Sequence, residues 1–86
     1  MTYEVRFKPS AEKALAALPR ANQLQILRRL EALAKDLRPP GVEKLNGTAE
    51  ELHRVRQSDY RIIYVIRDAV LLVVIVRIGH RQEVYR

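Results

Sequence analysis

The 86-residue chain has no cysteine and no tryptophan, and it has only two histidines, His53 and His80. The absence of cysteine excludes a disulfide framework, a thiolate metal site and a cysteine nucleophile. The spacing of the histidines and acidic residues matches no zinc or calcium site. We therefore predict that the protein binds no metal and no organic cofactor, so that its chemistry comes from its other polar side chains.

Long apolar runs are also missing. The longest extends over residues 69–76, which is too short to cross a bilayer as a helix. The first seven residues alternate like a strand and lack the apolar run and cleavage site of a secretory signal. The sequence thus predicts a cytoplasmic protein without membrane association. A chain of this length builds one modest core, so we expect a single domain over residues 1–86.

Positive charge is concentrated in the carboxy-terminal part of the chain. The formal net charge is +6, and residues 53–86 carry seven arginines, no lysine and only three acidic residues. Basic chains commonly bind nucleic acid, an anionic membrane surface or an acidic protein. Because the sequence has no amphipathic basic helix and no tryptophan, a membrane is the weakest of these candidates.

Periodicity predicts one strand and two helices in the first half. Residues 3–7 alternate between apolar and polar side chains, as in a half-buried strand that ends before Pro9. Ser10 is a candidate cap for a first helix that ends near Pro19. A second helix is predicted from residue 21 or 22 to Leu37, antiparallel to the first. Its expected apolar stripe consists of Leu24, Leu27, Leu30, Leu33, Ala34 and Leu37.

Three further strands are predicted in the second half, over residues 52–57, 60–67 and 70–78, after a loop-like segment at residues 42–51 with a turn at Asn46-Gly47. These elements predict an α+β fold. It has an N-terminal strand, a two-helix hairpin and a three-stranded antiparallel meander, which form one sheet with the helices on one face.

The other face of this sheet would keep several apolar side chains, namely Ile63, Val65, Leu72, Val74 and Val76. Two explanations are open. Such a patch commonly marks a protein-binding surface, which predicts a partner chain. Alternatively, curvature of the sheet and the long stems of arginine side chains cover it.

The arginines of the first predicted hairpin are the main candidate for function. A turn at Ser58-Asp59 sets Arg56 directly opposite Arg61, and Arg54 lies on the same face two residues earlier. Like charges in this position destabilise a sheet, so a polyanion such as a nucleic-acid backbone is the expected ligand. The alternative is a solvated basic face whose arginines pair with Glu50, Glu51 or Asp59.

The residues after the last strand could complete this site. Gly79 permits a break in the strand, so His80 and Arg81 could turn toward the arginines, and Tyr85 could reach the same place. His80, with an ordinary pKa of about 6.5, is the natural acid or base, and Tyr85 is the second candidate. Arg77 falls on the face of Tyr60 and Tyr64 by parity, so we expect a structural role for it.

The sequence resembles the RelE/ParE superfamily of type II toxins, and most closely the RelE branch. The resemblance covers nearly the whole chain and is most specific in three segments: Leu-His-Arg-Val-Arg (52–56), Asp-Tyr-Arg-Ile-Ile-Tyr (59–64) and Arg-Ile-Gly-His-Arg-Gln-Glu-Val-Tyr-Arg (77–86). The family's functional cations match Arg54, Arg56, Arg61 and Arg81, and its terminal tyrosine matches Tyr85. Some relatives carry lysines in the second strand, so the arginines here shift the expected proton exchange to His80 or Tyr85.

The resemblance implies a metal-independent endoribonuclease that cleaves messenger RNA in the ribosomal decoding site and so inhibits translation. It also implies a cognate antitoxin, acidic or partly disordered, and allows a heterotetramer with that antitoxin. Two other functions remain open. One is a ParE-like inhibitor of DNA gyrase that catalyses nothing, and the other is a basic RNA-binding module without toxicity.

Overall fold

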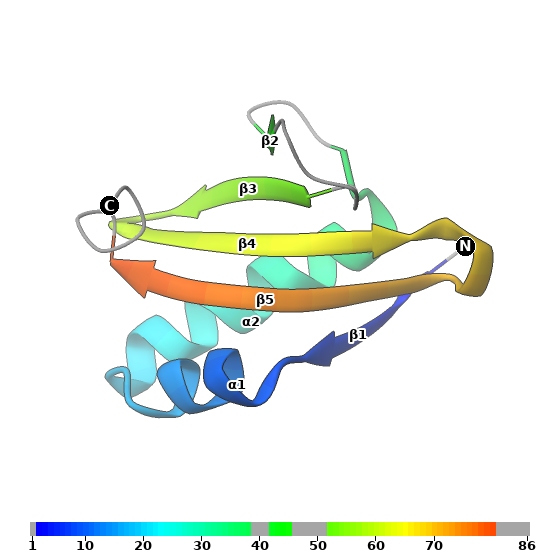
Figure 1. The fold of residues 1–86 in the computed structure, drawn as a ribbon. Helices are drawn as coiled ribbons and strands as arrows, with labels where there is room; N and C mark the ends of the chain where they lie inside the picture. The colour runs from blue at the N-terminus through cyan, green and yellow to red at the C-terminus, as the bar shows by residue number, and fades with distance from the viewer. Residues whose placement is uncertain (1, 39–41, 46–51, 81–86) are drawn as a thin grey trace.

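The computed structural model describes residues 2–38, 42–45 and 52–80. Two helices, α1 (Pro9–Ala16) and α2 (Arg20–Lys35), follow the first strand and lie on one face of a sheet (Figure 1). A 3-10 turn, η1 (Asp68–Val70), joins the last two strands. The strands are β1 (Glu4–Phe7), β2 (Glu43–Leu45), β3 (Leu52–Gln57), β4 (Tyr60–Arg67) and β5 (Leu72–His80). The predicted α+β class is therefore confirmed.

The sheet has the strand order β1-β5-β4-β3-β2. Strand β1 runs parallel to β5, and the other neighbours are antiparallel. The first of the three later strands was placed correctly, but the loop predicted for residues 42–51 is wrong at its start, because Glu43–Leu45 pairs with β3 as an edge strand. Three residues are too few for an alternating pattern to be read. The predicted turn at Asn46-Gly47 lies outside the described residues.

The core lies between the helices and the sheet. Its largest fully buried side chain is Tyr64 on β4, whose hydroxyl donates a 2.7 Å hydrogen bond to the carbonyl of Leu37 after α2. This bond satisfies a phenol and a carbonyl that would otherwise be costly to bury. The remaining core residues are Ala11, Ile26, Leu30, Leu33, Leu37, Val55, Ile62, Ile66, Val73, Ile75 and Ile78.

Helix α2 is rotated relative to the predicted stripe. Ile26 is fully buried, whereas Leu24 and Leu27 are 39% and 38% exposed. At about 100° per residue, Ile26, Leu30 and Leu33 share one narrow face, and Leu24 falls nearly opposite to it. The apolar stripe of this sequence is wider than the surface that the sheet can cover. The centre of the buried face therefore differs from the one that the spacing of the leucines predicts.

Helix α1 begins two residues earlier than predicted. Lys8 occupies the cap position, and Pro9 is a residue of the first helical turn. Proline is suited to this place, because its fixed φ matches the helix and its missing N–H would have no partner there. Ser10 is thus a residue of the first turn and not the cap.

A β-bulge interrupts the pairing of β4 with β5. Ile63 pairs with Arg77 but Tyr64 pairs with Ile75, so Val76 is an extra residue on β5. An extra residue reverses the faces of all the side chains that follow it. Arg77 consequently lies on the face of Ile63, away from the helices. The prediction that Arg77 shares the face of Tyr60 and Tyr64 is wrong for this reason.

The apolar residues on the face away from the helices are not a large exposed patch. Val65 is 3% exposed, and Ile63, Leu72, Val74 and Val76 are half-buried. The exposed large apolar side chains among the described residues lie elsewhere, on α2 and at the β4–β5 connection. Of the two explanations considered above, cover within the chain fits this face better than an obligatory partner. In the described ranges no helix is long and apolar enough to cross a membrane.

Asp68 joins three parts of the fold at the end opposite the β3–β4 turn. Tyr3, just before β1, donates a hydrogen bond from its hydroxyl to Asp68, and Arg38, after α2, donates one at 3.2 Å. These contacts lower the pKa of Asp68, the Tyr3 hydrogen bond most strongly and the Arg38 contact in addition. The amino terminus, the end of the helical hairpin and the β4–β5 connection therefore meet at one carboxylate.

We expect Asp68→Asn to destabilise the protein above about pH 4 and to have little effect in strong acid. The folded-state pKa is below the unfolded value of about 3.9. The carboxylate therefore adds stability above that value, and this stability is lost as the pH falls through the folded pKa. Urea unfolding of wild type and variant at several pH values measures the difference. Tyr3→Phe, which removes the main cause of the shift, should weaken the same pH dependence. A difference between wild type and Asp68→Asn that is constant down to strong acid would contradict this assignment.

Candidate nucleic-acid interface

The two-residue turn between β3 and β4 sets the register of the candidate site. Gln57 pairs with Tyr60 across the turn, and Ser58 has a φ of 54°, in the left-handed region. A tight turn with positive φ matches the right-handed twist of the two strands. The pair next to it is Arg56 with Arg61. The predicted cross-strand arginine pair is thus present in the structure.

Four arginines gather at this end of the face that points away from the helices. One row across the sheet contains Arg56, Arg61 and Gly79, and the next contains Arg54, Ile63 and Arg77. Neighbouring strands are about 4.8 Å apart, so both rows lie within reach of long side chains. We call Arg54, Arg56, Arg61 and Arg77 the arginine face. Sequence reasoning missed Arg77, because the bulge at Val76 gives no clear signal in the alternation of residues 70–78.

One member of the arginine face already has an acidic partner. Arg54 donates a 2.6 Å hydrogen bond to Glu43, which lies opposite it on β2, and the Arg54 side chain is only 17% exposed. Pairing with Glu50, Glu51 or Asp59 was considered from sequence, and Glu43 was not, because its segment was taken for a loop. Part of the face is therefore neutralised from within the chain, at Arg54.

Arg56 and Arg61 differ strongly in their surroundings. Arg61 is only 5% exposed and donates a long 3.4 Å hydrogen bond to the carbonyl of Tyr60. Arg56 is exposed and forms no hydrogen bond or ion pair with any residue in the described ranges. Charges close to a low-dielectric interior act on a neighbouring group more strongly than charges in open water. The pair thus combines a fixed, buried cation with a solvated one.

His80 does not lie on the arginine face. Strand β5 continues through Gly79, with Gly79 opposite Arg61 and His80 opposite Tyr60. The rings of Tyr60 and His80 meet edge to face, with centroids 5.9 Å apart. Because side chains alternate along a strand, His80 points to the side of the sheet that carries the helices. The expected break at Gly79 is wrong. Arg81 and Tyr85 lie outside the described residues.

His53 is part of the core and not of the site. It is 4% exposed, pairs with Tyr64 across β3 and β4, and stacks on its ring with centroids 5.6 Å apart. A histidine held flat against a buried aromatic ring is a packing element.

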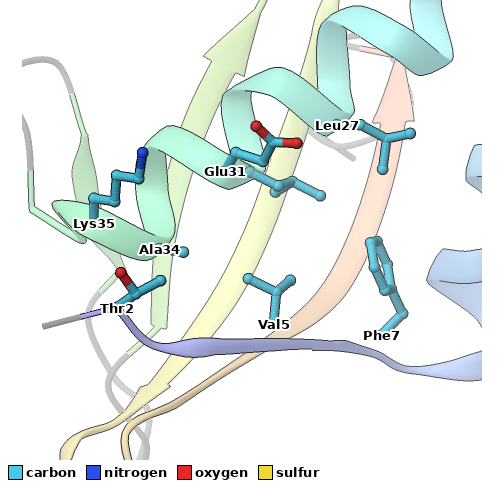
Figure 2. Close-up of a pocket in the computed structure, with 8 residues that line it drawn as sticks. Thr2, Val5, Phe7, Leu27, Glu31, Ala34 and Lys35 are labelled. Carbon is cyan, nitrogen blue, oxygen red and sulfur yellow. The ribbon is translucent and has the colours of Figure 1, made fainter.

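An apolar groove lies on the helix side, between β1 and α2 (Figure 2). Its volume is about 470 Å³, and Val5 and Phe7 point into it from the strand while Leu27 approaches from the helix. Glu31 and Lys35 are its only charged lining residues. Its described lining is mostly apolar, so it offers mainly apolar contact and has no cluster of cations like the arginine face.

Comparison with known proteins identifies the class. Residues 5–85 match the family model of the ParE toxin of the type II toxin–antitoxin system parDE, so the chain belongs to this family of toxins. A relative from Escherichia coli described as a RelE-like toxin protein is 29% identical over 84 residues, which cover 96% of this chain and 87% of the relative.

Solved structures place the chain in the RelE-like branch of the RelE/ParE superfamily. RelE in the archaeal RelE–RelB complex from Pyrococcus horikoshii matches with a TM-score of 0.82 and 33% identity, over 94% of this chain and 97% of the other. The RelBE2 toxin–antitoxin complex from Mycobacterium tuberculosis gives a TM-score of 0.81 and 27% identity, covering 94% and 100%. Isolated Escherichia coli RelE gives 0.79 and 25%, covering 96% and 90%.

We expect Arg56→Gln to stabilise the folded protein by roughly 0.2–1 kcal/mol, because it removes one of two like charges that lie opposite each other. The gain should shrink at high salt, where the repulsion is screened. Urea unfolding at low and high ionic strength measures it. Arg67→Gln, on an exposed arginine at the far end of β4, is the matched control and should give no such gain. A loss of stability in Arg56→Gln would mean that the two guanidinium groups do not repel.

Proposed function

We propose that this toxin is a ribosome-dependent endoribonuclease that cleaves messenger RNA in the decoding site and so stops translation in the cytoplasm. The observation that carries the proposal is the cross-strand pair of Arg56 and Arg61, with Arg54 on the same face. The fold does not require this crowding, and a phosphate group relieves it by binding between planar guanidinium groups. Membership of the RelE-like branch supports the same reading.

The proposed reaction needs no water and no metal. The ribose 2′-oxygen attacks the adjacent phosphorus and loses its proton, the bond from phosphorus to the 5′-oxygen breaks, and that oxygen takes up a proton. The products are a 2′,3′-cyclic phosphate and a 5′-hydroxyl. Extra negative charge develops on the phosphorane, and the arginines stabilise it electrostatically, while the ribosome aligns the RNA. We assign this role to Arg54, Arg56 and Arg61, and on the resemblance alone to Arg81.

The ion pair of Arg54 with Glu43 gives the three arginines of the first hairpin different parts in this proposal. Glu43 fixes the guanidinium group of Arg54 and offsets its charge. Arg56, which has no such partner among the described residues, has its full charge to offer to an incoming phosphate. Arg61 is held by its burial, so it needs little reorganisation when charge develops next to it. We therefore assign RNA capture mainly to Arg56 and transition-state stabilisation mainly to Arg61.

The proposed reaction also needs a group that accepts and donates protons. Arginine holds its proton near neutral pH, so the arginine face itself supplies no base. Tyr85 is our first candidate, because it matches the terminal tyrosine of the family. His80 is the second candidate, but it pairs with Tyr60. Its side chain therefore lies on the opposite face of the sheet from that of Arg61.

We further propose that a cognate antitoxin, acidic or partly disordered, neutralises this toxin, in an assembly that can be a heterotetramer. Solved relatives include a RelE–RelB complex from Pyrococcus horikoshii and the RelBE2 toxin–antitoxin complex from Mycobacterium tuberculosis. The formal net charge of +6 suits an acidic partner. Covering the arginine face would block RNA without any change of fold.

A second candidate function has one specific observation in its favour. The matching family model is that of the ParE toxin from the parDE system. A ParE-like protein would inhibit DNA gyrase and would need no proton carrier. The location of His80 away from the arginine face removes one candidate proton carrier from the nuclease proposal. The two functions therefore have to be separated by experiment.

We expect Arg61→Gln to reduce messenger cleavage by about 10²–10³, as removal of one preorganised charge stabiliser does, and Arg56→Gln to reduce it mainly by weakening RNA capture. Primer extension on messenger in a purified translating extract measures the cleavage. Because Arg56→Gln should be at least as stable as wild type, its loss of activity cannot be attributed to unfolding. Arg67→Gln serves as the matched control and should cleave normally.

Two results would overturn the nuclease proposal. One is intact messenger with folded wild-type protein present. The other is gyrase-dependent DNA breakage with undamaged messenger, which would establish the ParE-like function instead. Harmless overexpression in a bacterial host, together with RNA binding, would support a module without toxicity.

We expect His80→Asn to keep most of the cleavage activity, because the register directs His80 away from the arginine face. Loss of a true general acid or base would cost about 10²–10⁴ in rate and would remove a limb of the pH profile. Cleavage rates of wild type and variant from pH 5 to 9 distinguish these results. Tyr85→Phe is the companion variant, and we expect it to show the large loss. A large loss in His80→Asn with wild-type stability would return the proton-carrier role to His80.

A further inference from the structure

A second hollow lies on the open edge of β5, next to the start of α1. Its volume is about 460 Å³, and it is lined by Lys8, Ser10, Ala11, Val76, Arg77 and Ile78. The two longest of these side chains are cations, and no carboxylate is among them. Glu12, the nearest acidic residue along α1, lines a different hollow with Pro9 and Lys13. This lining contrasts with the apolar groove between β1 and α2.

The hollow exists because β1 is shorter than β5. Their parallel pairing ends at Phe7 and Ile75, and the N–H of Lys8 donates a last hydrogen bond to the carbonyl of Ile75. The chain then turns at Pro9 into α1, while β5 continues to His80. Among the described residues, no strand lies beside β5 on the β1 side from Val76 onward. An unpaired edge of this kind is open to an incoming polar backbone.

Lys8 and Arg77 are both exposed, and the hollow lies between them. Two cations that line one hollow attract an anion into it. The same reasoning applies to Arg56 and Arg61. The bulge at Val76 is what makes this arrangement, because it turns Arg77 onto the arginine face.

The hollow is continuous with the arginine face. Gly79 lies directly opposite Arg61, and Arg77 precedes it by two residues on the same strand. Residues in this diagonal relation are about 7–8 Å apart, within reach of two long side chains. Gly79 is itself buried and places no side chain between them. Arg77 is exposed, so a phosphodiester chain that lies on the arginine face can reach Arg77 and Lys8.

We propose that Lys8 and Arg77 form a second phosphate subsite, which holds the RNA backbone next to the cleaved linkage. The proposal rests on the endoribonuclease function proposed above, and it adds the direction of the RNA. The strand crosses β3, β4 and β5 in turn and leaves over the start of α1. Lys8 and Arg77 are positioning residues, because they contact a phosphate that does not react.

The first test measures binding of a short, fluorescein-labelled single-stranded RNA by anisotropy at several salt concentrations. We expect Lys8→Gln and Arg77→Gln each to weaken binding roughly fivefold, as loss of one exposed ionic contact does. Each should also lower the slope of log K against log salt by about 0.7, the value per phosphate for single strands. Lys13→Gln, a neighbouring cation that lines the other hollow, is the matched control and should leave affinity and slope unchanged.

The second test separates positioning from catalysis. In single-turnover cleavage of ribosome-bound messenger, Lys8→Gln and Arg77→Gln should raise the toxin concentration for half-maximal rate and leave the maximal rate within about twofold. Arg61→Gln should instead lower the maximal rate. Arg77→Lys, which keeps the charge, should recover most of the affinity.

The outcomes distinguish the subsite from the function on which it rests. Unchanged RNA affinity and salt slope in both variants, with wild type still cleaving messenger, overturn the subsite alone. Loss of maximal rate without loss of affinity also overturns it, because the residues would then act on the reacting phosphate. Absence of cleavage by wild type overturns the endoribonuclease proposal, and the binding measurements still decide whether Lys8 and Arg77 contact RNA.

Discussion

The register between β3 and β4 is the constraint on which the rest of the site depends. A two-residue turn fixes it, and a slip of one residue would move every side chain of β3 to the opposite face. The same register places Val55 against Ile62 in the core and Arg56 against Arg61 outside it. The hydrophobic pattern therefore holds two like charges together, because separating them would expose the core. Burial of the core stabilises the fold by more free energy than the repulsion between the two arginines costs.

The arginines of the arginine face differ in how far their charge is neutralised and in how far they are buried. Arg54 is partly neutralised by Glu43, Arg61 is buried beside the backbone of Tyr60, and Arg56 stands in solvent. A surface of this kind can be occupied by RNA or covered by an acidic partner through the same contacts. Under the proposed function, attack on RNA and neutralisation by an antitoxin involve the same set of guanidinium groups. Repulsion between the arginines destabilises the end of the sheet at the β3–β4 turn, whereas the contacts of Asp68 stabilise the opposite end, at the β4–β5 connection.

Many elements were predictable from the sequence because they depend on local pattern. The alternation of Tyr3, Val5 and Phe7 predicted the first strand, and the turn residues predicted the hairpin that pairs Arg56 with Arg61. Helix α2 was predicted within two residues, and four residues of its predicted stripe are buried. The stripe missed Ile26 and wrongly included Leu24 and Leu27. Strand β2 was missed because three residues carry too little periodicity, and with it the partner of Arg54 was missed.

The sequence alone determined the class of fold, the absence of cysteine chemistry and the presence of a basic hairpin, because composition, periodicity and turn chemistry act over a few residues. Only the tertiary structure decided which arginines lie together. The bulge at Val76 brings Arg77 to the arginine face, and the continuous strand through Gly79 takes His80 away from it. Both outcomes depend on how β5 pairs with β4 and packs on the helices. Such pairing depends on contacts between residues that are far apart in the sequence. A single extra residue reverses the face of every side chain beyond it.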